Sequence, residues 1–447
     1  MWTVIFLTLS VWAQQTYIKL GEATIEKSTL AIPEPVYLGN AQAGSSFIKV
    51  RSEIWDVLLR DLSVVGYFNI YPVSKLDEID PSSGLMPKEI EKNGFDFAEY
   101  KKAKVDFIVK VGFRIDKNTL IIESYSYQVA QASTILAHRY QGDLSSLREM
   151  VHKLADDFVT KISGKPTFLT KKLAVLIQKP KEVHKELYIM DWDGENRKKI
   201  TDHKTILLSP AWSKDGRKIA YTAFMQRKSS KVRNADLFIY DLDRQKSELI
   251  SFRKGINSGA CFEPNGTLLI TISTDADPDI YRIDMKGNII KKLTHGPLGA
   301  LNVEPAVSPD GKWIAFSSDR AGRPMIYISN AEGEDVRRLT FAGTFNAAPT
   351  WAPDSKTLAF AGWIDKAFDI YTIDRDGQQI KRITKAFKKD GKQASHENPD
   401  FSPDGRVIIY TSNRTGKSQL YMSLSDGSEE WAITQDQLNY YQPRWSP

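Results

Sequence analysis

Cysteine is almost absent from this chain of 447 residues, since Cys261 is the single one. One cysteine excludes an internal disulfide and any zinc site built from cysteines. Histidine is also scarce: the six histidines stand at positions 138, 152, 184, 203, 295 and 396, without the spacing of metal ligands. We therefore expect no metal and no cofactor, and we interpret Cys261 as a small buried apolar residue.

A strong charge of one sign is lacking as well. The 61 basic and 55 acidic residues leave a net charge of +6, and no stretch of the sequence gathers it into a basic stripe. A protein that binds nucleic acid usually has such a stripe, so we expect no nucleic-acid partner. The hydrophobic share of 41% and the charged share of 26% are typical of a folded, soluble protein. The length predicts two domains.

Long apolar runs are limited to the first residues, where Trp2–Trp12 is apolar almost throughout. This run is shorter than the about 20 residues that cross a bilayer. Followed by Ala13, it is similar to the core and cleavage site of a secretory signal, although no Lys or Arg precedes it. We expect a signal peptide at residues 1–13 and an exported chain that begins near Gln14. The alternative is a buried N-terminal strand.

The second half of the chain repeats a tight turn after a short apolar strand. The turns are AWSKDG (211–216), CFEPNG (261–266), AVSPDG (306–311), TWAPDS (350–355) and DFSPDG (400–405). Pro, Asp or Asn, and Gly each suit a turn that joins two antiparallel strands. Each unit ends in a short fourth strand, and these strands close at Thr201, Ser251, Thr294, Thr340, Thr384 and Thr434. Four strands at a period in the forties predict a propeller of six blades.

The two ends of this repeat region complement each other. The first unit begins at residues 169–178 with what matches a second strand, and no first strand precedes it. The C-terminal YQPRWSP (441–447) matches a first strand with nothing after it. One blade is therefore predicted to combine both ends, which closes the ring and removes two free sheet edges. We expect this all-β six-bladed propeller at residues 168–447.

Residues 14–163 lack the repeat and alternate between strand and helix patterns. The predicted strands are 17–25, 30–38, 105–115, 120–127 and 134–140. A helix is predicted from Ser46 to a stop at Gly66, and a second one from an Asp143 cap to Gly164. This combination predicts a small α/β domain at residues 14–163. The three residues 165–167 then form a link too short to let the domains separate far.

Catalytic motifs are missing from the chain. It contains no nucleophile elbow, phosphate loop, Rossmann glycine pattern or HExxH sequence, so we expect a protein that is not an enzyme. The turn Asp residues and the basic pairs of the fourth strands recur by blade, as structural features do. The exception is the pair His396-Glu397 at a predicted channel mouth. It supports the alternative of a propeller enzyme, or of an accessory module of a peptidase, that acts there.

Polar residues recur at the start of each predicted inner strand. Because inner strands line the channel of a propeller, these residues are expected to surround one mouth of it and to bind a peptide or a protein loop. The candidate partner-binding residues are Asn257, Ser258, Gly259, Asn302, Val303, Glu304, Asn346, His396 and Glu397. The alternative is that each Asn only caps the entry into its strand.

Several segments together resemble the TolB family of the Tol–Pal envelope system. They are the apolar N-terminal run, the predicted helix ahead of GYFNIYP, the junction at residues 164–171, and NVEPAVSPDGKWIAFSSDRAGRPMIY at residues 302–327. The resemblance covers essentially the whole chain. It implies a periplasmic, monomeric scaffold without catalytic activity that supports outer-membrane integrity and cell division.

The resemblance also implies partners. The family binds the peptidoglycan-associated lipoprotein Pal at the channel mouth, and Glu304 matches the glutamate of the family's Asn-x-Glu-Pro loop. It implies TolA as a second partner, bound through the mature N-terminus at Gln14–Tyr17. No segment after the N-terminal apolar run is long and apolar enough to cross a membrane, so we expect no direct membrane span.

Overall fold

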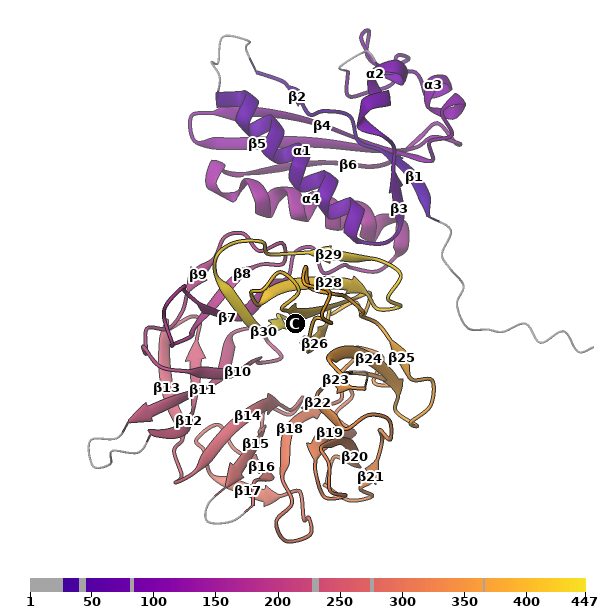
Figure 1. The fold of residues 1–447 in the computed structure, drawn as a ribbon. Coiled ribbons are helices and arrows are strands. Elements are labelled where there is room, and N and C mark those ends of the chain that lie inside the picture. The colour runs from indigo at the N-terminus through magenta and orange to yellow at the C-terminus, as the bar shows by residue number, and fades with distance from the viewer. Residues whose placement is uncertain (1–26, 40–45, 81–83, 227–232, 274–276, 365) are drawn as a thin grey trace, which may run out of the picture.

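The computed structural model describes residues 27–39, 46–80, 84–226, 233–273, 277–364 and 366–447. The N-terminal part forms a mixed sheet with helices, and the rest of the chain forms a ring of four-stranded blades (Figure 1). The predicted fold class, an α/β region followed by an all-β propeller, is confirmed. The predicted signal peptide at residues 1–13 and the predicted strand at 17–25 lie outside the described residues.

The described part of the N-terminal sheet has strand order β3-β1-β4-β5-β6, with β2 also paired to β4. The strands are β1 (Ser28–Ala31), β2 (Val36–Tyr37), β3 (Phe68–Ile70), β4 (Phe107–Asp116), β5 (Thr119–Gln128) and β6 (Ser133–Asp143). The antiparallel strands β4, β5 and β6 are the three that the sequence predicts between residues 105 and 140. β1 runs parallel to β3 and β4.

The prediction of a single strand at residues 30–38 is wrong. The chain forms β1 and β2 there, and these pair with different parts of β4. Pro33 and Pro35 lie between them, and proline has no N–H to donate to a neighbouring strand. β3 escapes prediction because three residues are too few to show an alternating pattern.

Two long helices cover the face of this sheet that is turned toward the propeller (Figure 1). α1 (Ser46–Val64) and α4 (Leu147–Ser163) confirm the two predicted helices. Gly66 and Gly164 follow them with φ angles of 75° and 73°, a conformation that glycine adopts without strain and that lets the chain turn away. The two helices therefore end at these glycines and lie between the sheet and the blades.

Smaller elements differ from the prediction. Asp143 caps a 3₁₀ turn, Leu144–Ser146, in front of α4 instead of capping α4 itself. The short helices α2 (Leu76–Ile79) and α3 (Phe97–Lys102) are not predicted, since one or two turns contain too little periodicity. They complete the N-terminal domain at the end away from the propeller (Figure 1).

The propeller has six blades, each with an inner, a second, a third and an outer strand. The inner strands are β10 (Leu207–Trp212), β14 (Ile256–Phe262), β18 (Asn302–Val307), β22 (Phe345–Trp351), β26 (His396–Phe401) and β30 (Asn439–Trp445). The second strands are β7 (Lys172–Gln178), β11 (Lys218–Gln226), β15 (Leu268–Ser273), β19 (Trp313–Ser318), β23 (Thr357–Trp363) and β27 (Val407–Ser412).

The third strands are β8 (Glu186–Asp191), β12 (Arg233–Asp241), β16 (Asp279–Ile283), β20 (Met325–Asn330), β24 (Phe368–Asp374) and β28 (Gln419–Leu424). The outer strands are β9 (Lys198–Lys199), β13 (Lys246–Ser251), β17 (Ile289–Lys292), β21 (Arg337–Arg338), β25 (Lys381–Arg382) and β29 (Glu430–Ala432). Four of the outer strands, β9, β17, β21 and β25, contain the recurrent basic pairs, and such charges discourage pairing with another chain.

The first blade is built from both ends of the propeller, as predicted. β30 is antiparallel to β7, with Tyr440 opposite Ile177 and Trp445 opposite Leu173. The blade order is therefore β30-β7-β8-β9. We number it blade 1, so that β10–β13 form blade 2 and β26–β29 form blade 6.

One apolar core continues from the N-terminal domain into blades 1 and 6. Phe168 is fully buried and lies with its ring centroid 5.5 Å from that of Trp192 and 5.3 Å from that of Trp445. In the link before it, Thr167 donates two hydrogen bonds to Asp156 of α4, from its backbone N–H and its hydroxyl. The link is thus fixed to the helix. The predicted domain limits, 14–163 and 168–447, stay a prediction.

None of the helices in the described part of the chain combines the length and the hydropathy that a bilayer crossing needs.

Candidate functional site

Every inner strand of the propeller contains a β-bulge near its start, where the register with the second strand shifts. One residue of each bulge has a φ angle between 50° and 66°; these residues are Ser209, Gly259, Glu304, Ala348, Asn398 and Gln442. Five of the six precede a proline. Proline is tolerated there because a bulge already interrupts the ladder of hydrogen bonds.

The six bulge residues together line the central channel of the propeller. This cavity has a volume of about 360 Å³ and continues to the tight turns, where Pro309, Pro353 and Pro403 line it. The bulges therefore surround one mouth of the channel and the turns the other. Among the six bulge residues only Glu304 carries a charge.

Four of the residues predicted at an exposed rim lie in the interior instead. The side chains with no exposed surface are those of Asn257, Asn302, Asn346 and His396. Each is the first or second residue of its inner strand and points between blades, two positions before the bulge residue. The expectation that these four side chains form a polar rim is therefore wrong.

The buried asparagines bind backbone and side-chain groups of the preceding blade and of the loop that leads into their own inner strand. The Asn257 amide donates to the carbonyls of Ala235 and Arg253 at 3.0 and 2.7 Å. Its oxygen accepts from the Ser251 hydroxyl at 2.7 Å. Asn346 similarly donates to the Ala342 carbonyl at 3.0 Å. Since a buried amide without partners would be costly, this supports the alternative that Asn fixes the entry into each strand.

His396 and Glu397 lie on opposite faces of β26. Nδ1 of His396 is 3.0 Å from Asp369 Oδ1, and its Nε2 accepts from Arg414 at 3.0 Å. Glu397 is exposed and lines a groove at the mouth. Successive residues of a strand point to opposite sides, so the two side chains do not converge on a common substrate position.

Three other predicted residues lie at or beside the mouth. Ser258 accepts a hydrogen bond from the Thr222 hydroxyl at 3.1 Å. Gly259 is a bulge residue, and a Cβ atom on it would lie 3.7 Å from the backbone of Glu304. Val303 lines the groove next to Glu304. The bulges of neighbouring blades are thus in close contact.

The Glu304 carboxylate connects blade 4 to blade 5. Its Oε2 accepts from the backbone N–H of Ala348, the next bulge, at 2.8 Å and from the Ser317 hydroxyl at 3.0 Å. Gln442 makes the same kind of contact in blade 1, since its Oε1 accepts from the backbone N–H of Ser209 at 2.7 Å. A neutral amide therefore suffices for this contact, and the charge of Glu304 is not needed for it.

An apolar groove of about 370 Å³ opens beside Glu304 over blades 4 and 5. Leu301, Phe345 and Phe368 line it together with Val303. The rings of Phe345 and Phe368 meet edge to face with centroids 5.5 Å apart. Glu304 lines both this groove and the channel. The mouth therefore places the Glu304 carboxylate beside an aromatic surface.

A lysine stacked on a tyrosine ring stands at the same mouth. The Lys185 ammonium lies 3.8 Å from the centroid of the Tyr441 ring. Burial lowers the pKa of Lys185, and the nearby Glu397 carboxylate partly opposes this. A lysine ammonium in these surroundings prefers an aromatic or anionic neighbour.

The sequence analysis did not identify a set of apolar residues that lie one position before the buried residues at the start of the inner strands. The exposed members are Ile206, Ile256, Leu301 and Phe345, with 37% to 42% of each side chain accessible. A signal for them is present in the sequence, because Ile, Leu or Phe precedes Asn in three of these loops. Large apolar residues that recur at the same exposed position indicate a contact surface.

Comparisons with known proteins agree with this fold. The family model described as the TolB beta propeller domain matches residues 159–447. The Tol-Pal system protein TolB of Desulfosudis oleivorans is 29% identical over 293 residues, which cover 65% of this chain and 63% of that protein. The Tol-Pal system protein TolB of Geobacter sulfurreducens is 32% identical over 209 residues, covering 47% of this chain and 45% of that protein. The matched segments thus span less than two thirds of these two relatives.

A crystal structure of TolB from Acinetobacter baumannii has the same fold, with a TM-score of 0.76 and 23% identity. The match covers 94% of this chain and 97% of that one, so it includes the N-terminal domain as well as the propeller. The family model alone covers more than half of the present sequence. Together with the six blades and the closing strand β30, these matches show that the chain belongs to the TolB β-propeller family.

Proposed function

We propose that this chain is a periplasmic scaffold of the Tol–Pal system that binds a Pal-type lipoprotein at the bulge-lined mouth of its propeller. Two relatives are named Tol-Pal system proteins, which supports this assignment and the expectation of a non-enzymatic protein. In this role the chain supports outer-membrane integrity and cell division and acts as a monomer. Export by a signal at residues 1–13 and TolA binding at Gln14–Tyr17 belong to the same proposal.

The position of Glu304 carries the proposal. It is the single charge among six bulge residues, and it stands where the channel meets the apolar groove. Oε2 is occupied by Ala348 and Ser317, whereas Oε1 accepts no hydrogen bond from the part of the chain that the structure describes. A loop of the partner can place a donor on Oε1 and an apolar side chain in the groove. Both contacts exclude water, which strengthens the charged one.

The test is calorimetric titration of the full chain with the soluble domain of the cognate Pal-type lipoprotein. Glu304→Gln keeps an oxygen for the N–H of Ala348 and removes the charge. We expect it to weaken binding by more than tenfold, because losing one member of a desolvated charged pair costs about 2–5 kcal/mol. Its melting temperature should stay near that of the wild type.

The matched control is Asp243→Asn, which removes an exposed carboxylate that pairs with Arg217. It should leave the affinity unchanged. If Glu304→Gln binds the lipoprotein as tightly as the wild type does, the site does not lie at this mouth. No comparable observation favours the enzyme alternative, since His396 and Glu397 point apart.

A further inference from the structure

A cluster of buried ionisable residues connects the N-terminal domain to blade 1. His152 lies on α4, and Asp61 lies on α1. Asp191 is the last residue of β8, and Asp193 follows in the turn after it. All four side chains are nearly inaccessible, with at most 3% of each residue exposed. The channel mouth does not include any of these residues.

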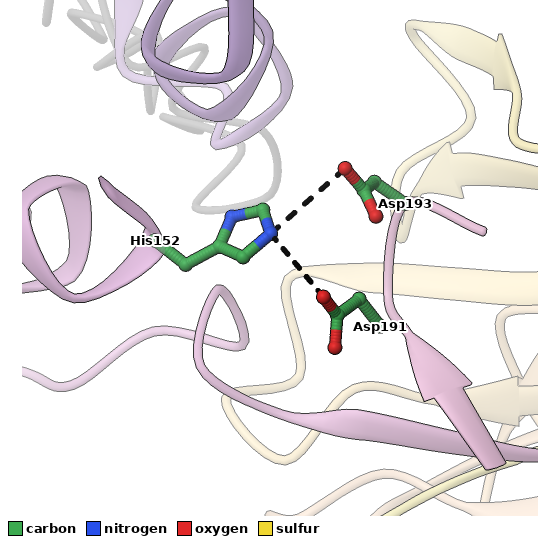
Figure 2. A group of neighbouring side chains, drawn as sticks. All are labelled: His152, Asp191 and Asp193. Carbon is green, nitrogen blue, oxygen red and sulfur yellow. Dashed lines mark ion pairs between the residues drawn. The ribbon is translucent and has the colours of Figure 1, made fainter. Parts of the chain in front are cut away.

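The imidazole of His152 points at both carboxylates of blade 1 (Figure 2). Its Nε2 lies 3.9 Å from Asp191 Oδ2 and 3.8 Å from Asp193 Oδ2. These distances are too long for hydrogen bonds. Nε2 accordingly has no hydrogen-bond partner among the described residues, although it is buried. A buried polar atom aimed at two carboxylates without touching either one leaves room for a bound ion between them.

The other ring nitrogen is fixed by the N-terminal domain. Nδ1 of His152 lies 2.8 Å from Asp61 Oδ2 and 3.1 Å from Asp61 Oδ1. When Nδ1–H donates to this carboxylate, Nε2 carries the free lone pair that a metal ion requires. Metal-binding histidines usually have such a carboxylate or carbonyl behind them, which orients the ring and increases its basicity.

We propose that His152, Asp191 and Asp193 bind a divalent transition-metal ion, such as Zn²⁺, between the two domains. One imidazole nitrogen and two carboxylate oxygens form a donor set that such an ion accepts. Ligand atoms about 2.0–2.2 Å from a tetrahedral ion stand on the order of 3.4 Å from one another. The observed 3.8 and 3.9 Å separations therefore need to contract by a few tenths of an ångström.

Neighbouring groups hold the two carboxylates in place and leave a negative charge. Lys172 and Asn196 donate to Asp191, and Arg148 donates to Asp193. Each carboxylate oxygen has a second lone pair for the ion. With a neutral imidazole, the three carboxylates of the cluster outweigh the two cations, Arg148 and Lys172, by one charge. A divalent cation is thus electrostatically favoured over an empty site with neutral His152.

The ion has a path to this position. A cleft of about 400 Å³ between the domains is lined by His152, Asp191 and Lys172, and by residues of β6 and α4 such as Tyr140 and Met150. Water in this cleft can supply a fourth ligand, and the ion can enter through it. Because the ligands come from both domains, binding of the ion and docking of the domains stabilise each other.

The test uses the untagged full chain after treatment with a chelator. Co²⁺ is added while visible absorption is recorded, and Zn²⁺ is titrated by calorimetry. We expect one ion per chain, the d–d absorption of Co²⁺ bound to nitrogen and oxygen ligands, and its displacement by Zn²⁺. Mg²⁺ should not displace Co²⁺. Excess Zn²⁺ should raise the melting temperature by a few degrees, since it binds only the folded chain.

Three variants locate the site. His152→Gln and Asp193→Asn each remove a ligand and should weaken Zn²⁺ binding by more than tenfold. Asp61→Asn should weaken it by about 10- to 100-fold through the orientation of the ring. His295→Gln removes an exposed histidine and is the matched control, with unchanged affinity. Circular dichroism of each variant distinguishes a loss of binding from a loss of folding. The Co²⁺ spectrum of the wild type tests ion binding without any variant.

Two results would overturn the proposal. The first is the absence of stoichiometric Co²⁺ or Zn²⁺ binding by the wild-type chain. The second is Zn²⁺ binding of equal affinity in the wild type and in the folded variants of His152 and Asp193. The fluorescence of Trp192 gives an independent readout, because this buried indole stands between the two aspartates in sequence and 6.0 Å from the His152 ring.

Discussion

The propeller and the N-terminal domain are held in place by different means. Blade packs on blade six times around the ring, and β30 closes it against β7. In the described part of the chain, the N-terminal domain instead has one asymmetric interface, in which α1, α4 and the residues just after α1 contact blades 1 and 6. Blade 1 takes part in both, since it contains β30 and also Trp192, on which Phe168 packs. Closure of the ring and docking of the domain therefore depend on the same blade.

The largest expected effect is that of removing β30. Deletion of residues 440–447 takes the inner strand away from blade 1 and exposes the edge of β7. It also removes Trp445 from its contact with Phe168. We expect aggregation instead of a moderate loss of stability, measured by size-exclusion chromatography and thermal unfolding. A soluble, cooperatively folding truncation with near-native melting would contradict the closed ring.

Phe168→Ala should have the next largest effect, because it separates the two parts and leaves the ring closed. Truncating a fully buried phenylalanine lowers the free energy of unfolding by about 3–5 kcal/mol. Scanning calorimetry of Phe168→Ala should then show two unfolding transitions, one for the N-terminal domain and one for the propeller. In the wild type the two domains should unfold more cooperatively. Phe387→Ala, at an exposed phenylalanine of blade 5, is the control and should change little. Equal losses in both variants would argue against a shared core.

Arg406→Ala should have the smallest effect of the three. Arg406 reaches from blade 6 to the N-terminal domain, where its Nε donates to the Val65 carbonyl at 2.9 Å. Its guanidinium carbon lies 3.6 Å from the centroid of the Tyr67 ring. Losing both contacts should reduce the free energy of unfolding by about 1–2 kcal/mol in chemical denaturation.

An exposed arginine of the ring provides the comparison for Arg406. Arg244 pairs only with Glu248 on the surface of blade 2 among the ion pairs of the described residues, and Arg244→Ala should cost less than about 0.5 kcal/mol. A change of the same size in Arg406→Ala would mean that the contacts of Arg406 with Val65 and Tyr67 contribute nothing to docking.

The same two regions differ in how far their sequences could predict them. In the propeller, turn residues and apolar strands repeat six times, so each unit supports the interpretation of the others. The N-terminal domain has no such repetition, and its errors fall where local patterns are short: β3 with three residues, and the break at Pro33 and Pro35. Long amphipathic helices such as α1 were predicted well because several turns share one apolar face.

The channel mouth was located correctly along the sequence, but the orientation of its side chains was not. The sequence predicts Asn257 and His396 at the surface, whereas both are buried. An exposed residue stands one position before Asn257 and one position after His396, and the channel-lining residues stand two positions after each of them. A bulge changes which residue points inward, and strand alternation alone does not reveal it. The cluster around His152 was equally invisible, since its members come from α1, α4 and blade 1.

The ring of bulges also has a consequence for how binding specificity can evolve. Ser, Gly, Glu, Ala, Asn and Gln occupy the six equivalent positions with nearly the same backbone, so the fold tolerates very different side chains there. Glu304 and Gln442 even form the same contact with the next blade. A single substitution can therefore add, remove or relocate a charge around the mouth without a new fold. Relatives with the same propeller can thereby diverge in what they recognise, one blade at a time.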